Sequence, residues 1–432
     1  MTEKLIRKVW IAVSAAALWG CGGASSYTAV DGVMLGTTLH ITADVQGVSP
    51  QELYAAVMEL DREAKASMSI FDPSSLLSRL NRNETDSVDR HIAFNLHLAD
   101  SIGALSGGRY DVTVKPLVEA WGFAGRQAER HPDVDSILAF VGREKVRVEE
   151  GRLVKADPRV QLDFNSIAKG YTVDLLARLV ESFGARNYIV DIGGEVRCKG
   201  VNRQGGPWRI GIETPFDGNM SDGEYVQKRI RLTDGGLATS GNYRRFYLDA
   251  DGNKVAHTID PRTGRSAVSR LLSVTVAAPT CAEADALGTM FLAMGADDAL
   301  KAVRTMPDVK AYFILADGTD GYEEYISPAM EAMIMVVATV VAPVMPVARY
   351  TATSRRLTLP TPSALHITSS SSAFRPTFSL PPMIAVVAGT APSARTISST
   401  LCANSTFCGY GIPWLRMVDS SATTGLPASM AS

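Results

Sequence analysis

Asp285 and Thr289 are the side chains in this sequence best spaced to hold a metal ion. They lie in the segment CAEADALGTMFLAMG, where Thr280 and Glu283 form a capping box that predicts the start of a helix. Residues four apart on a helix share a face, and a carboxylate together with a hydroxyl suits a hard cation such as Mg²⁺. The same pair occurs on many solvated helix faces, so the prediction depends on the segments around it.

A polar loop precedes this helix and adds hydroxyl, basic and imidazole groups. It contains Ser240, Asn242, Tyr243, two arginines and His257. An oxygen-lined metal site beside such a loop suits phosphate chemistry. A lone histidine is most often structural, but His257 ends a predicted hairpin strand that faces this loop, where an imidazole can act as a base or contact phosphate.

Three further segments have the residue types of a site for an anion or a ring. QLDFNSIAKGYTVD is predicted to turn into a helix capped by Asn165 or Ser166, and a helix N-terminus favours phosphate. In YIVDIGGEV, a strand ends near Asp191 and two glycines allow a turn or a close approach. In GGRYDVTVKP, Tyr110 and Asp111 can stack on a ring and accept its hydrogen bonds. Each segment taken alone also has an ordinary structural explanation.

The elements that must position these groups are predicted from periodicity, caps and turns. Helices are expected at about 50–65, 93–105 and 166–183, and from 281 onward. Strands are expected at 39–43, 187–192, 208–213, 225–232, 245–249, 254–259, 272–277 and 311–315, with a hairpin turn at Asp251-Gly252. Because the strands follow one another with few helices between them, we expect an α+β fold with a largely antiparallel sheet.

The two ends of the 432-residue chain differ from its middle. Residues 1–21 are predicted to be a signal peptide, with a basic start, an apolar run from Val9 to Leu18 and a lipobox cysteine, Cys21. Residues 22–29 are then a tether, 30–330 the catalytic domain, and 331–432 a low-complexity, disordered tail. We therefore expect a protein exported to the periplasmic side of a bacterial membrane and anchored by lipid on Cys21. Cleavage by the ordinary signal peptidase and an uncleaved anchor are the alternatives.

The composition excludes some classes of function. The formal net charge of −2 gives no electrostatic basis for binding nucleic acid. Five cysteines without a C-x-x-C pair indicate neither a zinc ribbon nor thioredoxin-type chemistry. The tail from Ala332 has no lysine or glutamate, and its abrupt change in composition is also compatible with a frame-shifted read-through.

Eight segments in this order resemble the ApbE family of FAD:protein FMN transferases over about residues 30–328. They are MLGTT, SIFDPSSLLSRLN, GGRYDVTVKPLVEAWGF, DFNSIAKGYTVD, VDIGGE, ATSGNYRRFY, HTIDPRTG and ADALGT. The resemblance implies an α+β fold of the tunnelling type. It also implies Mg²⁺-dependent transfer of FMN from FAD to a threonine or serine hydroxyl of a target flavoprotein, with release of AMP.

The resemblance also implies roles for individual residues. Metal binding is assigned to the Ala168 carbonyl, Asp285 and Thr289. Contacts with FAD are assigned to Met34, Phe71, Arg109, Tyr110, Asp111, Asn165, Tyr171 and Ile259, with His257 near the scissile pyrophosphate. We expect His257, or an acid near the metal, to be the base. Phe71 stands where the family usually has tyrosine, and Arg109 where a small residue is usual.

Three other functions remain compatible with the sequence. One is an Mg²⁺-dependent FAD pyrophosphatase that uses water and gives FMN and AMP. Another is a non-catalytic, exported flavin-binding lipoprotein, which would not need Asp285 and Thr289. The third is a damaged copy with little activity, suggested by the unusual tail. The target flavoprotein, the oligomeric state and the choice of inner or outer membrane are not determined by the sequence.

Overall fold

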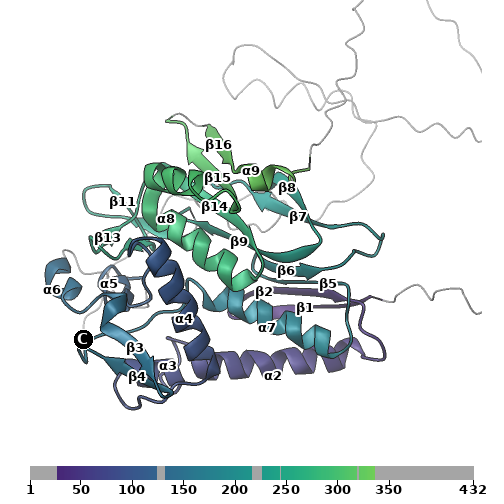
Figure 1. Ribbon diagram of the computed structural model, residues 1–432, viewed down its shortest axis with the longest axis horizontal. Helices are drawn as coiled ribbons and strands as arrows, with labels where there is room; N and C mark the ends of the chain where they lie inside the picture. Colours follow the sequence, from purple (N-terminus) through teal and green to yellow (C-terminus); the bar gives the residue numbers. More distant parts are fainter. Residues whose placement is uncertain (1–26, 124–131, 217–225, 244, 319–320, 336–432) are drawn as a thin grey trace, which may run out of the picture. The chain divides into compact units, whose positions relative to one another are not determined.

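An eight-stranded sheet forms the centre of the fold, and all of its neighbouring strands are antiparallel (Figure 1). Its strands, in spatial order, are β1 (Thr28–Met34), β2 (Thr37–Ala43), β5 (Tyr188–Ile192), β6 (Glu195–Lys199), β9 (Asp234–Gly241), β14 (Leu271–Ala278), β15 (Lys310–Ala316) and β16 (Tyr322–Ile326). This computed structural model describes residues 27–123, 132–216, 226–243, 245–318 and 321–335, all within one compact unit. The predicted signal peptide and most of the predicted tail lie outside the described residues.

Four long helices pack beside the sheet, and a separate hairpin packs on its other face. The helices are α2 (Pro50–Met68), α4 (Arg90–Leu105), α7 (Ala168–Ser182) and α8 (Cys281–Arg304), and the hairpin is β7 (Trp208–Glu213) with β8 (Val226–Leu232). Val190 and Ile192 of β5 pack with the buried residues of α7. Ile189, the residue before Val190, packs with Trp208 and Ile230 of the hairpin instead. Alternate residues of one strand thus contribute to two separate cores, as the pleat of a strand requires.

Shorter elements complete the described part of the chain. They are α3 (Leu76–Asn81), α5 (Lys115–Ala120), α6 (Val134–Leu138), the 3₁₀ turn Arg143–Lys145, β3 (Val146–Glu149), β4 (Arg152–Lys155), β10 (Phe246–Leu248), β11 (Lys254–Ala256), β12 (Ile259–Asp260), β13 (Arg265–Ser266) and α9 (Pro328–Glu331). The predicted turn at Asp251-Gly252 joins β10 to β11. No helix among the described residues is long and apolar enough to cross a membrane.

The predicted helix starts are confirmed in two cases and wrong in one. Ser49 and Glu52 form a reciprocal capping box at α2, and the Thr280 side chain accepts a hydrogen bond from the Glu283 amide at α8. Helix α7, however, begins at Ala168, and its N-cap residue is Ile167, which has no side-chain cap. Ser166, one of the two expected caps, instead places its hydroxyl 2.9 Å from that of Tyr110.

Helices α7 and α8 cap one another. Asp174 of α7 accepts hydrogen bonds from the amides of Cys281 and Ala282, each 2.9 Å long, at the start of α8. Asp285 of α8 in turn accepts a 3.0 Å bond from the Gly170 amide near the start of α7. Free amides at helix starts need such partners when they are buried. The reciprocal caps therefore fix the two helix starts against each other.

Candidate active site

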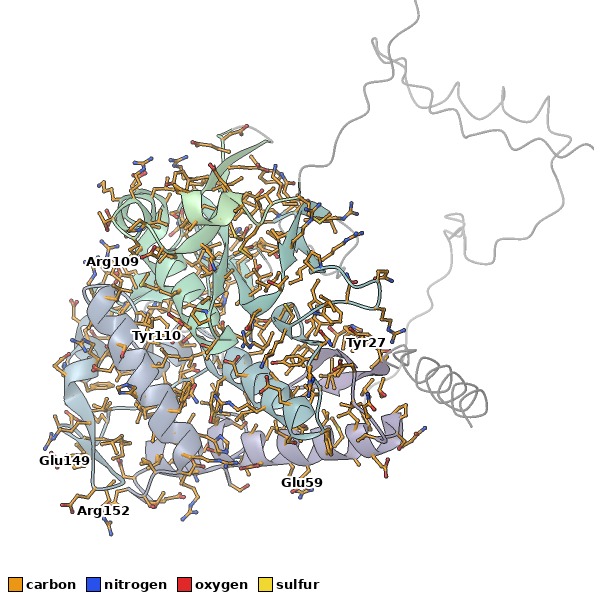
Figure 2. All side chains as sticks on the ribbon, turned by 45° about the vertical axis from the view of Figure 1, so that its right-hand side comes forward. Tyr27, Glu59, Arg109, Tyr110, Glu149 and Arg152 are labelled. Carbon is orange, nitrogen blue, oxygen red and sulfur yellow. The ribbon has the colours of Figure 1, made fainter. Side chains whose placement is uncertain are left out.

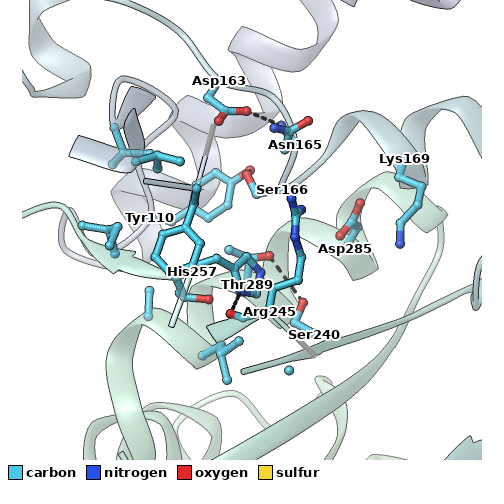
Figure 3. Close-up of a pocket in the computed structure, with 18 of the residues that line it drawn as sticks. Tyr110, Asp163, Asn165, Ser166, Lys169, Ser240, Arg245, His257, Asp285 and Thr289 are labelled. Carbon is cyan, nitrogen blue, oxygen red and sulfur yellow. Dashed lines mark hydrogen bonds between the residues drawn. The ribbon is translucent and has the colours of Figure 1, made fainter. Parts of the chain in front are cut away.

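A pocket of about 290 Å³ lies where the starts of α7 and α8 meet β9 and the loop after α4 (Figure 3). Eight of the predicted site residues line it. They are Arg109, Tyr110, Asp111, Asn165, His257, Ile259, Asp285 and Thr289. These residues come from segments up to 180 positions apart, from Arg109 to Thr289, so the fold brings together what the sequence shows only as separate motifs.

The predicted pair on α8 faces this pocket. Asp285 is 5% exposed, and the hydroxyls of Thr289 and Ser240 lie 3.3 Å apart. Burial raises the pKa of the Asp285 carboxyl, while the nearby Lys169 ammonium and the Gly170 amide pull it back down. No ion pair joins Asp285 to a described lysine or arginine. The carboxylate is therefore buried at the pocket wall with only part of its charge compensated.

An ion pair between a half-buried lysine and a buried glutamate lies next to Asp285. The Lys169 ammonium of α7 contacts the Glu195 carboxylate of β6 at 2.5 Å. Burial opposes the charge on Lys169, but the negative charges of Glu195 and Asp285 outweigh it and raise the pKa of the ammonium. Burial raises the pKa of Glu195, and the Lys169 ammonium pulls it back down. Lys169 is thus the positive group that balances two buried carboxylates.

His257 is held in a defined tautomer. Its Nδ1 lies 3.3 Å from the backbone carbonyl of Arg245, and a carbonyl oxygen only accepts, so Nδ1 carries the proton. Burial, with a smaller contribution from the Arg245 charge, lowers the pKa of His257 to about 4. The imidazole is therefore neutral near pH 7, with Nε2 left as a proton acceptor. Phe123 contacts the ring edge-on, with centroids 6.3 Å apart.

Tyr110, Asp163 and Asn165 form the wall opposite α8. Tyr110 is 3% exposed and its hydroxyl contacts Ser166, while burial raises the pKa of this phenol. The Asp163 carboxylate accepts a 2.8 Å hydrogen bond from the Asn165 amide, and burial raises its pKa. Asp111 bonds to the amide and hydroxyl of Thr113 at 2.8 and 2.7 Å. This wall can offer acceptors and one aromatic ring to a ligand.

Arg109 has partners on α8 as well as a place at the pocket. Its guanidinium donates to the Met294 carbonyl at 3.0 Å and pairs with Asp298. Helix α8 has a break between these two residues, at Gly295, whose φ is 72°. Arg109 therefore bridges the break in α8, next to the end of α4 (Figure 2).

Four residues named by the resemblance do not line the pocket. Met34 is fully buried in the core between β1, α2 and α7, and Phe71 is 64% exposed in the turn after α2. The Ala168 carbonyl accepts a 2.7 Å hydrogen bond from the Thr172 hydroxyl. The structure places Tyr171 in a different polar cluster. Their roles toward FAD or a metal stay predictions.

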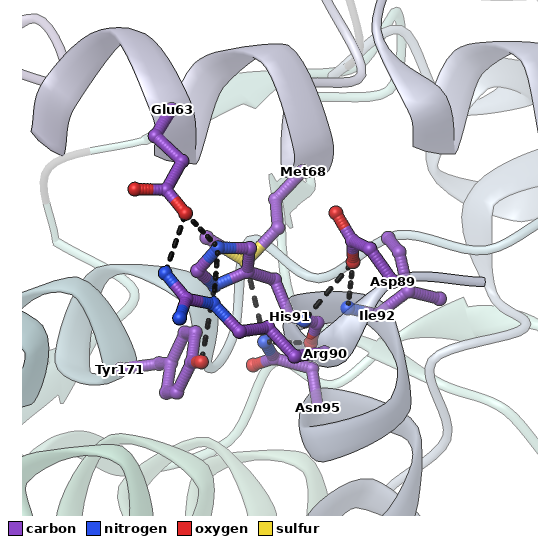
Figure 4. Close-up of polar contacts among 8 residues, drawn as sticks. All are labelled: Glu63, Met68, Asp89, Arg90, His91, Ile92, Asn95 and Tyr171. Carbon is purple, nitrogen blue, oxygen red and sulfur yellow. Dashed lines mark hydrogen bonds and ion pairs between the residues drawn. The ribbon is translucent and has the colours of Figure 1, made fainter. Parts of the chain in front are cut away.

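The cluster around Tyr171 lies between α2, α4 and α7 (Figure 4). The Tyr171 hydroxyl is 3.1 Å from Nδ1 of His91, and Nε2 of His91 is 3.0 Å from the Glu63 carboxylate. Phe94 stacks on the Tyr171 ring with centroids 4.5 Å apart. The Tyr171 hydroxyl and both ring nitrogens of His91 therefore have their partners within the packing of these helices.

Sequence reasoning did not single out two of the charged groups in the pocket. Glu195 follows the diglycine of VDIGGE, and Asp163 stands in QLDFN, so both lie inside motifs that were noted for other residues. The importance of Glu195 depends on its pairing across the fold, between β6 and α7. A local pattern contains no signal for such a contact.

The donor set fits a hard divalent cation. Carboxylate, hydroxyl and carbonyl oxygens are the ligands that Mg²⁺ prefers, and Asp285 with Thr289 supplies the first two on one pocket wall. Within the described ranges, no group of three or more His, Cys, Asp or Glu side chains is placed to hold a metal. A soft-metal site of the zinc type therefore has no support in that part of the chain, and an oxygen-lined site depends on Asp285.

Comparison with known proteins gives one consistent result. Residues 35–313 match the model of the ApbE family. The chain is 36% identical to the FAD:protein FMN transferase of Vibrio cholerae over 329 residues, which cover 73% of this chain and 96% of the relative. It is 35% identical to the protein of the same name from Haemophilus influenzae, over 72% of this chain and 93% of the relative.

Solved structures agree with the sequence relatives. The flavin transferase ApbE from Vibrio cholerae superimposes with a TM-score of 0.62 at 33% identity, covering 71% of this chain and 99% of that one. The apo form of the flavinyl transferase ApbE from Pseudomonas stutzeri gives a TM-score of 0.64 at 28% identity, covering 71% and 96%. The antiparallel α+β fold expected from the sequence is thereby confirmed.

Proposed function

The chain belongs to the ApbE family and is an FAD:protein FMN transferase, and we propose that it attaches FMN to a threonine or serine hydroxyl in an Mg²⁺-dependent reaction that releases AMP. The observation that carries the proposal is the meeting of Asp285, Thr289 and His257 in one pocket. A hard-cation donor pair and a neutral imidazole are the groups that phosphoryl transfer to a hydroxyl needs.

The reaction balances as a displacement at phosphorus. The acceptor oxygen forms a bond to the FMN phosphorus of FAD, the bond from that phosphorus to the bridging oxygen breaks, and AMP leaves with the electron pair. The hydroxyl proton passes to a base. Mg²⁺ bound by Asp285, Thr289 and the Ala168 carbonyl would neutralise charge on the pyrophosphate.

His257 is the residue that we propose as the base. Its Nδ1–H is committed to the Arg245 carbonyl, which leaves Nε2 as the acceptor. A pKa of about 4 keeps the ring neutral but makes it a weak base. The negative pyrophosphate of bound FAD would raise that pKa toward neutrality, where general-base catalysis is most effective.

The test is a turnover assay with the purified chain, FAD, Mg²⁺ and a threonine-bearing flavoprotein acceptor. In-gel flavin fluorescence and AMP release are read together. We expect a fluorescent acceptor band and AMP in equal amounts. AMP with free FMN and no band across a panel of acceptors would instead indicate the pyrophosphatase, and bound FAD without AMP would indicate a carrier or an inactive copy.

The His257→Ala variant separates catalysis from binding. We expect it to bind FAD but to transfer FMN about 10²-fold more slowly or worse. His97→Ala is the matched control, because His97 is exposed and lies outside the pocket. Full transfer by His257→Ala would exclude the imidazole as the base.

We also propose that the chain is exported and anchored through a lipid on Cys21. The basic start, the short apolar run and the cysteine that follows it support this proposal. In cells fed a labelled fatty acid, the chain should carry the label and sediment with membranes. The Cys21→Ser variant should lose both properties, and an unlabelled wild-type chain would contradict the anchor.

A further inference from the structure

A second hollow, of about 450 Å³, meets the active-site pocket from the other face of the central sheet. It lies between the β7–β8 hairpin and the strands β2, β5, β6 and β9, and we call it the hairpin groove. Its lining includes Thr38, His40, Asp191, Arg209 and Arg229. Ile189, Val196 and Leu237, which also line it, belong to the core on the side away from α7.

The hairpin groove and the active-site pocket share three residues, Gly193, Thr239 and Tyr243. Gly193 begins the turn between β5 and β6 with a φ of 55°, and a Cβ there would lie 2.5 Å from the Thr37 hydroxyl. Its neighbour Gly194 would place a Cβ in open space. At Gly193, one of the three shared residues, the wall between the two hollows is therefore bare backbone.

The groove offers an extended polypeptide both main-chain and charged partners. Strand β7 pairs with β8 along one edge, and no described strand pairs with its other edge. Such an edge can accept an added strand. Arg209 and Arg229, diagonal neighbours across the hairpin, are exposed and form no ion pair with a described carboxylate.

The remaining charged groups of the groove already have partners. His40 pairs with Asp31 at 2.7 Å. Asp191 accepts a 2.8 Å hydrogen bond from the Gly194 amide, and Glu213 also has a partner. The two arginines are therefore the groups that select the charge of an incoming segment, and they favour a negative one.

We propose that the hairpin groove binds an extended, acidic segment of the target flavoprotein and delivers its hydroxyl to the active-site pocket past Gly193 and Thr239. This inference rests on the proposed function, because it gives the second substrate of that reaction its place. In-line displacement needs the nucleophile to approach opposite the leaving AMP. A route from the other face of the sheet allows FAD to fill the first pocket while the acceptor enters from the second.

The decisive experiment measures steady-state kinetics of FMN transfer with the double variant Arg209→Glu/Arg229→Glu. The acceptor is the flavoprotein that becomes fluorescent with the unsubstituted chain. We expect KM for the acceptor to rise about tenfold or more, because each reversal removes an attraction and adds a repulsion. The Kd for FAD and kcat at saturating acceptor should stay within about twofold.

Arg186→Glu is the matched control. Arg186 is exposed and forms no ion pair with a described carboxylate, but it does not line the groove. Its KM should be unchanged. Replacing the acidic residues beside the modified hydroxyl with lysine should restore a low KM to the double variant and weaken binding to the unsubstituted chain.

A steric variant keeps the test decisive if the charge reversals disturb folding. Thr38→Trp fills the groove from β2, and Thr42→Trp makes the same change on the same strand face outside it. We expect only Thr38→Trp to raise KM for the acceptor. An unchanged KM in both groove variants, with folding intact, would overturn the groove. Absence of transfer by the unsubstituted chain would instead refute the proposed function.

Discussion

Removing the Asp174 carboxylate is expected to loosen the helix that carries Asp285 and Thr289, the pair proposed to bind the metal. Its two oxygens accept the amides of Cys281 and Ala282, and the side chain is 5% exposed. In Asp174→Ala both amides lose a charged acceptor and no water can easily replace it. A buried donor left without a partner costs about 1–3 kcal/mol. Two such donors, partly relieved by relaxation, give a loss of about 2–4 kcal/mol in the free energy of unfolding.

The assay for Asp174→Ala is equilibrium urea denaturation of the purified chain, followed by tryptophan fluorescence. Asp174→Asn is the matched variant, because an amide oxygen can still accept one of the two hydrogen bonds. We expect it to lose about half as much stability as the alanine variant. Because Asp285 lies one turn beyond the capped amides, the alanine variant should also need more Mg²⁺ for half-maximal transfer.

A loss below about 0.5 kcal/mol in Asp174→Ala would refute this reasoning, since it would mean that the two amides find other partners. Equal losses in the alanine and asparagine variants would also contradict it. In that case the charge of Asp174, and its 4.0 Å approach to Arg197, would matter more than the caps.

Three further changes have directions fixed by the structure. Between pH 7.5 and 4.5, His257 becomes protonated in the unfolded chain, where its pKa is near 6.5, but stays largely neutral in the folded chain, where its pKa is about 4. The free energy of unfolding should therefore fall by about 2–3 kcal/mol over this range. Urea titrations at both pH values should show this loss in the unsubstituted chain and not in His257→Gln. Gly170→Ala would place its Cβ 2.4 Å from the Cys281 carbonyl oxygen. Alanine has the better helix propensity by about 1 kcal/mol, but the clash should outweigh it. Denaturation experiments should show the free energy of unfolding lowered by about 2 kcal/mol or more. In Asp285→Asn the side chain can still accept a hydrogen bond from the Gly170 amide, so this variant should be more stable than Asp285→Ala. Both variants should lose Mg²⁺-dependent FMN transfer. Retained metal dependence in either variant would contradict the proposed metal site.

Local signals predicted the elements that carry the chemistry. The helix from Cys281 was expected from its cap and apolar period, and the shared face of Asp285 and Thr289 follows from the helical repeat alone. The strand Trp208–Glu213 was also predicted with its observed bounds. These features depend on neighbours within a few residues, so one sequence contains enough information to find them.

Strand β9 was not predicted, although it is central to the sheet and to the pocket. Its sequence, DGGLATSG, is rich in glycine and has no clear alternation, which normally counts against a strand. The structure supplies the reason for one glycine: a Cβ on Gly236 would lie 2.3 Å from the Cys281 amide at the start of α8. The close approach of strand β9 to helix α8 therefore requires glycine at this position, although glycine has a low propensity for strands.

The cap of α7 was wrong for a related reason. Asn165 and Ser166 have the right residue types for an N-cap, but the acceptor at this helix start comes from Asp285, 115 residues away from Gly170. The pairing of Lys169 with Glu195 is likewise made across the fold. Local sequence can rank candidate caps and charges, but only the tertiary contact decides which of them is used.

The balance of charge in the pocket is a physical reason to expect a divalent cation in the reaction. Four carboxylates line it, Asp111, Asp163, Glu195 and Asp285, and burial raises the pKa of each. Three basic side chains also line the pocket. Lys169 is paired with Glu195 and Arg109 with Asp298, so only Arg245 adds a positive charge without a described ion pair. A pyrophosphate brings further negative charge into this low-dielectric space, and repulsion from unscreened carboxylates at such distances is severe. A cation held by Asp285 would turn that carboxylate from a source of repulsion into part of the binding site for the substrate.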